Sequence, residues 1–183
     1  MERLRCAASP RTKRPGPNET QMDLLATSVQ FELGELGSEQ LPDIAVRMLQ
    51  TGHDSPALRE VAGEVQPNMA DTGARFADAL RELGVAITRR EACLLRAEAI
   101  AHEIAAGAVA PTNGGSDIYY LERHFGEIPE LKPFLREYWR TPPPVTDAEE
   151  AARDALLCEA ARALEGQIRA TVAVQQRGRS RRS

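Results

Sequence analysis

From residue 22 to residue 107, apolar residues recur every three or four positions, a spacing that places them on one face of an α-helix. Each apolar stretch ends at a glycine, the residue favoured just past a helix C-terminus. With their final glycines, the expected helical stretches are residues 22–34, 38–52, 55–63, 68–84 and 88–107. No segment of useful length alternates with a period of two. The pattern therefore predicts an all-α protein.

Two of these stretches show which residues should face a core. In the first, the apolar stripe consists of Met22, Leu25, Val29 and Leu33. In the fourth, it consists of Met69, Gly73, Phe76, Leu80 and Leu83. Helix starts are also marked, because Ser55 precedes Pro56 as an N-cap and Thr88 forms a capping box with Glu91.

Aromatic residues gather late in the chain, where six of the eight lie between positions 119 and 139. Most of them fall on apolar helical faces, such as the face formed by Ile118, Leu121 and Phe125, and core packing is expected for these. Tyr120 and Trp139 lie off those faces, and aromatic residues at such positions often anchor protein interfaces. The predicted partner-contact residues are Tyr119, Tyr120, Arg123, His124, Trp139 and Arg140.

The C-terminal part begins with "TPPPV" at residues 141–145, a composition typical of a stiff linker. Thr146 and Glu149 form a second capping box, which predicts a long helix over residues 146–175. Its apolar seam has a short heptad-like spacing and consists of Leu157, Ala161, Leu164, Ile168 and Thr171. The seam favours docking onto the preceding domain, with a homo-oligomer through this helix as the alternative.

Together these features predict a compact domain of six to seven short helices followed by the long C-terminal helix. The expected organisation is a disordered basic tail over 1–21, a helical domain over 22–140, a Pro-rich linker over 141–145, the C-terminal helix over 146–175 and an Arg-rich tail over 176–183. Met22 begins the well-patterned sequence, so it is a second candidate for the translation start.

Charge is unevenly distributed along the chain. Residues 1–17 carry five basic residues against Glu2, and residues 177–183 add four arginines, whereas residues 18–176 contain 14 basic and 26 acidic residues. An acidic body repels phosphate, so nucleic-acid association is expected only through the Arg-rich tails, as an alternative function. No apolar run reaches the roughly 18 residues of a membrane span, and three scattered cysteines suggest a reducing, cytoplasmic setting.

Catalytic and metal-binding motifs are incomplete. "HEIAA" at residues 102–106 begins like the zinc motif H-E-x-x-H, but Ala106 stands where the second histidine is needed. "TNGGSD" at residues 112–117 has the glycines of a phosphate loop but lacks the Lys-Ser/Thr pair. We interpret it as the turn between a helix ending at Gly107 and a helix capped by Ser116. No cofactor, metal or catalytic residue is therefore predicted.

Residues 22–140 resemble a family of small helical bacterial proteins of uncharacterised function. The similarity lies in "GHDSPALREVAGE", in "ALRELGVAITRREACLLRAEAIAHEIAAGAVAP", in a glycine three residues later and in "IYYLER". The resemblance implies a helical fold. It implies no functional residue, because no activity is established for the family.

Three functions remain open at this point. The leading hypothesis is a non-enzymatic protein-interaction protein with an adaptor or immunity-type role. The second is the nucleic-acid association through the Arg-rich tails. The third is an enzyme of unknown type with a site over residues 119–124, at Tyr119, Glu122, Arg123 and His124.

Overall fold

The computed structural model describes residues 23–140 and 146–180, with side chains placed as far as residue 172, and every regular element in it is a helix. Seven shorter α-helices precede one long helix within these residues, and no strand is present in them, which confirms the predicted all-α class. The elements are α1 (Leu24–Glu32), η1 (Ser38–Gln40), α2 (Leu41–Gln50), α3 (Pro56–Ala62), α4 (Thr72–Glu82), α5 (Arg89–Ala105), α6 (Pro111–Phe125), η2 (Pro129–Leu131), α7 (Lys132–Arg140) and α8 (Asp147–Ser180). The basic tail and the Pro-rich linker expected from the sequence lie outside the described residues.

The predicted caps at Ser55 and Thr88 are present. The Ser55 hydroxyl accepts a hydrogen bond from the Leu58 amide at 3.2 Å at the start of α3. Thr88 and Glu91 form the expected capping box at the start of α5. At the other ends, Gly84 (φ 74°) and Gly107 (φ 71°) adopt the left-handed conformation that glycine tolerates best. These start and stop signals of the sequence therefore act as predicted, whereas the starts of α4 and α6 differ.

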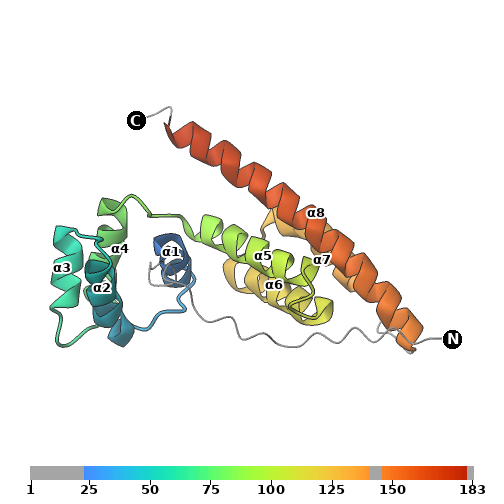
Figure 1. The fold of residues 1–183 in the computed structure, drawn as a ribbon, viewed down its shortest axis with the longest axis horizontal. Helices are drawn as coiled ribbons and strands as arrows, with labels where there is room; N and C mark the ends of the chain where they lie inside the picture. The colour runs from blue at the N-terminus through green and yellow to red at the C-terminus, as the bar shows by residue number, and fades with distance from the viewer. Residues whose placement is uncertain (1–22, 141–145, 181–183) are drawn as a thin grey trace.

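The helices form two groups with separate hydrophobic clusters. In Figure 1, α2, α3 and α4 lie at one end of the molecule, α5 to α8 at the other, and α1 between them. The first cluster contains buried side chains of α2, α3 and α4 together with Leu36. The second contains buried side chains of α5 to α8 and of the connection between α6 and α7, together with Val29 of α1 and Leu33 just after it. Each group has enough apolar side chains to bury a core of its own.

Helix α1 connects the two groups. The Phe31 ring packs edge-on against Phe76 at 5.1 Å in the first cluster, while Val29 belongs to the second. The buried Ser28 hydroxyl also donates a hydrogen bond to the Val85 carbonyl oxygen at 2.9 Å. Because α1 packs on two sides, its core residues do not form one stripe. Leu25, predicted to face the core, is exposed.

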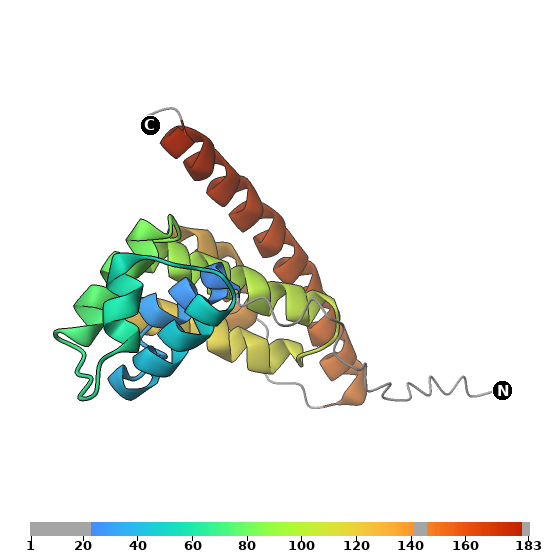
Figure 2. The ribbon, with the colours of Figure 1, turned by 60° about the vertical axis from the view of Figure 1, so that its left-hand side comes forward.

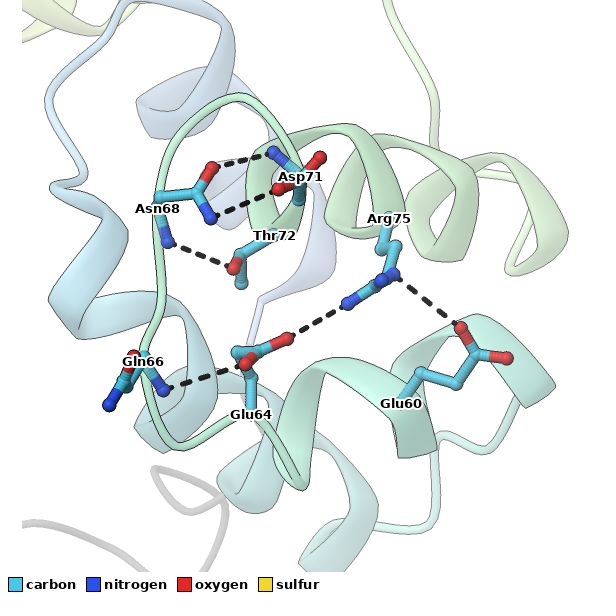
Figure 3. Close-up of polar contacts among 7 residues, drawn as sticks. All are labelled: Glu60, Glu64, Gln66, Asn68, Asp71, Thr72 and Arg75. Atoms are coloured by element: carbon cyan, nitrogen blue, oxygen red, sulfur yellow. Dashed lines mark hydrogen bonds and ion pairs between the residues drawn. The ribbon is translucent and has the colours of Figure 1, made fainter.

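The start of α4 differs from the prediction. Two hydrogen bonds join Asn68 to residues at the start of the helix: the Asn68 side-chain oxygen accepts from the Asp71 amide at 2.9 Å, and the Thr72 hydroxyl accepts from the Asn68 amide at 3.1 Å (Figure 3). These bonds make residues 69–71 a turn and start the regular helix at Thr72. Met69, predicted in the apolar stripe, is therefore exposed.

Ion pairs at the surface of the same region connect α4 to α3 and to the residues that follow α3. The Arg75 guanidinium lies 2.8 Å from a carboxylate oxygen of Glu64 and 3.7 Å from one of Glu60 (Figure 3). Exposed ion pairs of this kind contribute little to stability. We interpret these contacts as part of the folded connection between α3 and α4 and not as a functional site.

The stretch "TNGGSD" is helical, which corrects its interpretation as a turn. Helix α6 begins at Pro111 and includes all six residues, so the connection between α5 and α6 is residues 106–110. Gly114 and Gly115 are buried, and a Cβ on Gly114 would lie 2.6 Å from Cγ1 of Ile104. The glycines are thus explained by close packing of helices. Ser116 is not an N-cap, because its hydroxyl donates to the Thr112 carbonyl oxygen at 3.1 Å or bonds the Tyr138 hydroxyl at 2.8 Å.

Helix α8 docks through its apolar seam, as the sequence favours. Leu164 and Ile168 are buried in the second cluster, and Leu157 is also buried, on the helix that packs against α5, α6 and α7. Arg169 adds ion pairs with Glu98 of α5 at 2.8 Å and with Glu165 at 2.6 Å. Both ribbon views show the C-terminal end of α8 projecting past the other helices (Figures 1 and 2). The helix continues to Ser180, past the predicted end at residue 175.

Candidate functional site

Helices α6 and α7 carry all six predicted partner-contact residues. Tyr119, Tyr120, Arg123 and His124 lie on α6, and Trp139 and Arg140 lie on α7. Tyr120 is 55% exposed and Trp139 is 62% exposed, although both are large apolar side chains. The sequence argument that these two residues lie off the core faces agrees with their exposure.

The rings of this region form one continuous series of contacts. Trp139 meets Tyr138 at 5.1 Å and Tyr119 at 5.1 Å, both edge-on, and Tyr119 meets Tyr120 at 5.7 Å. The series continues from Tyr120 to His124 at 6.5 Å. From His124 it reaches Phe125, also at 6.5 Å. We call these six side chains the aromatic strip: Tyr138, Trp139, Tyr119, Tyr120, His124 and Phe125.

Both ends of the strip are fixed to the body of the protein. At one end, Tyr138 is half-buried, and its hydroxyl lies 2.8 Å from the Ser116 hydroxyl. At the other end, Phe125 is half-buried, and the Arg89 guanidinium lies 6.0 Å from the centre of its ring. The exposed rings in between are therefore held by neighbours with restricted freedom. Such a surface loses little side-chain entropy when a partner covers it.

The two predicted arginines are not part of these ring contacts. Arg140 forms a long ion pair with Glu137, 3.8 Å between Nη1 and Oε1. Arg123 is exposed, and no ion pair joins it to another residue in the described part of the chain. The structure thus brings together the ring-bearing members of the predicted set and leaves the arginines beside them.

Next to the strip lies a cleft of about 370 Å³ between α5 and α6, which we call the α5–α6 cleft. Three members of the strip, Tyr120, His124 and Phe125, also line this cleft. The cleft residues are Glu35, Arg96, Ile100, Glu103, Asp117, Tyr120, Leu121, His124 and Phe125. The sequence analysis did not identify the α5 side of this cleft. Its only signal was the helical spacing of Arg96, Ile100 and Glu103, which also fits an ordinary solvated face.

The charges of the cleft are unequal. Glu35 forms an ion pair with Arg96, so these two residues neutralise each other. Glu103 and Asp117 are exposed carboxylates, and within the described ranges no side-chain hydrogen bond or ion pair compensates either of them. The cleft therefore presents uncompensated negative charge beside aromatic rings.

Reactive groups elsewhere are engaged in the fold. Cys93 is buried, and burial raises the pKa of its thiol to about 11. His102 lies 3.0 Å from a carboxylate oxygen of Glu165, between α5 and α8. No group of three metal-ligating side chains is found in the described part of the chain. Of the four residues in the enzyme hypothesis, only His124 lines the cleft, and Tyr119, Glu122 and Arg123 do not.

A second depression, of about 540 Å³, lies against α1 and α2 and is larger than the cleft. It is lined mainly by polar side chains, including Glu39, Asp43 and Arg47, and no aromatic residue borders it. Because no aromatic side chain lines it, the strip and the cleft form the better candidate site.

Comparisons with known proteins add no assignment. A scan against protein-family models, a search of curated proteins and a search of solved structures each found no match. The resemblance to a family of small bacterial proteins therefore stays a prediction. None of the described helices has the length and apolar character required to cross a membrane.

Proposed function

We propose that this protein is a non-enzymatic helical interaction protein that binds a partner protein through the aromatic strip. The observation that carries the proposal is the exposure of Tyr120 and Trp139 within one connected series of rings. Isolated exposed apolar residues are ordinary, but a connected aromatic surface is typical of interfaces. An adaptor or immunity-type role in the cytoplasm of a bacterial cell fits this surface.

The size of the exposed rings supports protein binding. Large aromatic side chains bury roughly 150–250 Å² each, and tryptophan and tyrosine are enriched among the residues that dominate binding energy. More than half of Trp139 and of Tyr120 is still accessible. A partner that covered both rings would remove a substantial apolar area from water.

The alternative of nucleic-acid binding is less well supported at this surface. Aromatic rings stack on bases, but binding proteins of that kind combine the rings with a positive groove. Here Glu103 and Asp117 lie in the cleft that Tyr120 borders. These carboxylates repel phosphate. The Arg-rich tails that motivate the alternative extend beyond the part of the chain that the structure describes.

The apolar seam of α8 does not need a second copy of the chain to cover it. The apolar seam of α8 is already used within the chain, since Leu157, Leu164 and Ile168 are buried against α5 to α7. The aromatic strip, in contrast, keeps its central rings accessible. We therefore place the partner on α6 and α7.

The proposal is tested by crosslinking in the native cells. A photoreactive phenylalanine analogue replaces Trp139 in one variant and Val65 in a control variant. Val65 is 87% exposed on the connection between α3 and α4, and these two helices lie at the opposite end of the molecule from α7 in Figure 1. We expect one protein to be crosslinked from position 139 and not from position 65. Equal crosslinking patterns from both positions, or no adduct from position 139, contradict the proposal.

A further inference from the structure

The α5–α6 cleft has the form of a groove between two antiparallel helices. Ile104, near the end of α5, faces Gly114 near the start of α6, and Arg89 at the start of α5 lies over Phe125 at the end of α6. Cleft residues on α5 are spaced by four and three positions, and those on α6 lie within one helical face. Grooves of this kind accept an amphipathic segment of another protein, which places apolar side chains at helical spacing into the groove.

Three half-buried side chains form an apolar floor of the cleft. Ile100 of α5 and Leu121 and Phe125 of α6 are half-buried and belong to the edge of the second hydrophobic cluster. Tyr120 adds the face of an exposed ring. An apolar residue of a partner segment would lie against this floor.

Two carboxylates of the cleft select the sign of the charge. Glu103 and Asp117 come from opposite helices, and among the described residues no cation neutralises them. The only arginine that lines the cleft, Arg96, is already paired with Glu35. The cleft therefore attracts a cation and repels an anion.

The protein itself provides an example of a guanidinium on one of these rings. Arg89 lies 6.0 Å from the centre of the Phe125 ring, within the range of a cation–π interaction. Carboxylates beside ring faces form the environment that recognises an arginine or lysine side chain. The Tyr120 ring and the two carboxylates offer this environment to a side chain from outside.

We propose that the α5–α6 cleft binds an arginine or lysine side chain of an amphipathic basic segment in the partner protein. The inference rests on the proposed function and deepens it, because Tyr120 and His124 line the cleft and belong to the aromatic strip. The apolar face of the partner segment covers the strip, and its basic residue enters the cleft between Glu103 and Asp117.

A segment of another protein fits better than the basic segments of this chain. Residues 1–21 contain Leu4 as their single Leu, Ile, Val or Phe residue, and residues 177–183 contain none. Such segments supply cations but little apolar surface for Trp139 and Tyr120. The occupant therefore has both a basic edge and an apolar face.

The experiment uses the full chain and its intrinsic fluorescence, because Trp139 is the only tryptophan. One probe is a synthetic amphipathic helical peptide with leucine on one face and arginine at the edge of that face. The second probe is the same peptide with citrulline in place of arginine, which keeps the shape and removes the charge. Both peptides are titrated while the Trp139 emission is recorded.

We expect the arginine peptide to bind about tenfold more tightly than the citrulline peptide, the effect of one hydrogen bond to a charged group. In the Glu103→Gln/Asp117→Asn variant this preference should disappear. The matched control is Glu39→Gln/Asp43→Asn, which removes the same charge from exposed residues beside α1 and α2. The control should keep the preference, which separates a specific cleft from general attraction to an acidic protein.

Each other outcome has a defined meaning. Equal binding of both peptides with a Trp139 response overturns the cation site and leaves the proposed function intact. If neither peptide changes the Trp139 emission, the inference is also overturned. The proposed function is tested separately, by the crosslinking at position 139. A change in Trp139 emission in the peptide-free Arg3→Gln/Arg5→Gln variant identifies the chain's own N-terminal segment as the occupant, and overturns a partner segment.

Discussion

Replacing Gly114 by alanine tests the packing of α5 against α6, on which the cleft depends. A Cβ on Gly114 would lie 2.6 Å and 2.7 Å from Cγ1 and Cδ1 of Ile104, and 3.2 Å from Cγ2 of Ile100. Both neighbours are β-branched, so they adjust less easily than a flexible side chain. We expect the helices to shift apart or the isoleucines to leave their preferred rotamers. Either response destabilises the fold.

The magnitude follows from two opposing effects. Replacing glycine by alanine inside a helix stabilises it by about 1 kcal/mol. Overpacking a close-packed contact costs about 1–3 kcal/mol. Gly166 of α8 provides the matched control, because it is helical and a Cβ there would meet nothing within 4 Å. Gly166→Ala should therefore stabilise the protein, while Gly114→Ala should leave its stability unchanged or lower it.

The assay is urea unfolding followed by circular dichroism at the helical band. Both variants gain the same intrinsic helix preference of alanine over glycine. The difference between their free energies of unfolding is therefore the steric cost at Gly114, about 1–3 kcal/mol. The result that refutes the reasoning is equal stabilisation by both substitutions. In that case Gly114 would not lie against Ile104, and the position of α6 on α5 would be wrong.

Three further predictions concern the core, a cap and a thiol. Ile168→Ala should destabilise the protein by about 2–5 kcal/mol in thermal unfolding, because Ile168 is fully buried on the docked face of α8. Leu156→Ala should have little effect, because Leu156 is half-exposed on the same helix, and equal effects would contradict the docking of α8. Ser55→Ala should cost about 1 kcal/mol in the same assay, because the Leu58 amide loses its acceptor, and an unchanged unfolding midpoint would argue against the cap. Burial raises the pKa of the Cys93 thiol from 9.0 to about 11, so at pH 8 the protonated form predominates. Because the thiolate is the nucleophile and Cys93 is buried, alkylation of Cys93 at pH 8, followed by peptide mass spectrometry, should be much slower in the folded protein than in urea, and equal rates would show that the thiol is accessible.

Local features of the sequence predict much of this fold. Ser55, the Thr88–Glu91 pair and the Thr146–Glu149 pair mark helix starts because each cap involves residues within one turn. The exposure of Tyr120 and Trp139 follows from their positions outside the apolar faces. These predictions needed no knowledge of which helix lies next to which.

Features that depend on tertiary contacts were not predictable in the same way. Adjacent glycines are typical of turns, and only the positions of Ile104 and Tyr138 show why Gly114 and Gly115 lie inside a helix. Leu25 is exposed because α1 packs on two sides. The cleft required knowing that one face of α5 adjoins one face of α6.

The central claim is that the partner binds the aromatic strip. Once the partner is identified, its affinity for the Trp139→Ala variant tests this claim most directly, with Val65→Ala as the control. Removing the exposed 62% of Trp139 from an interface loses about 3 kcal/mol, from roughly 25 cal/mol per Å² over about 130 Å². We predict a dissociation constant raised about a hundredfold for Trp139→Ala and unchanged for Val65→Ala. Equal affinities of the two variants would contradict the account.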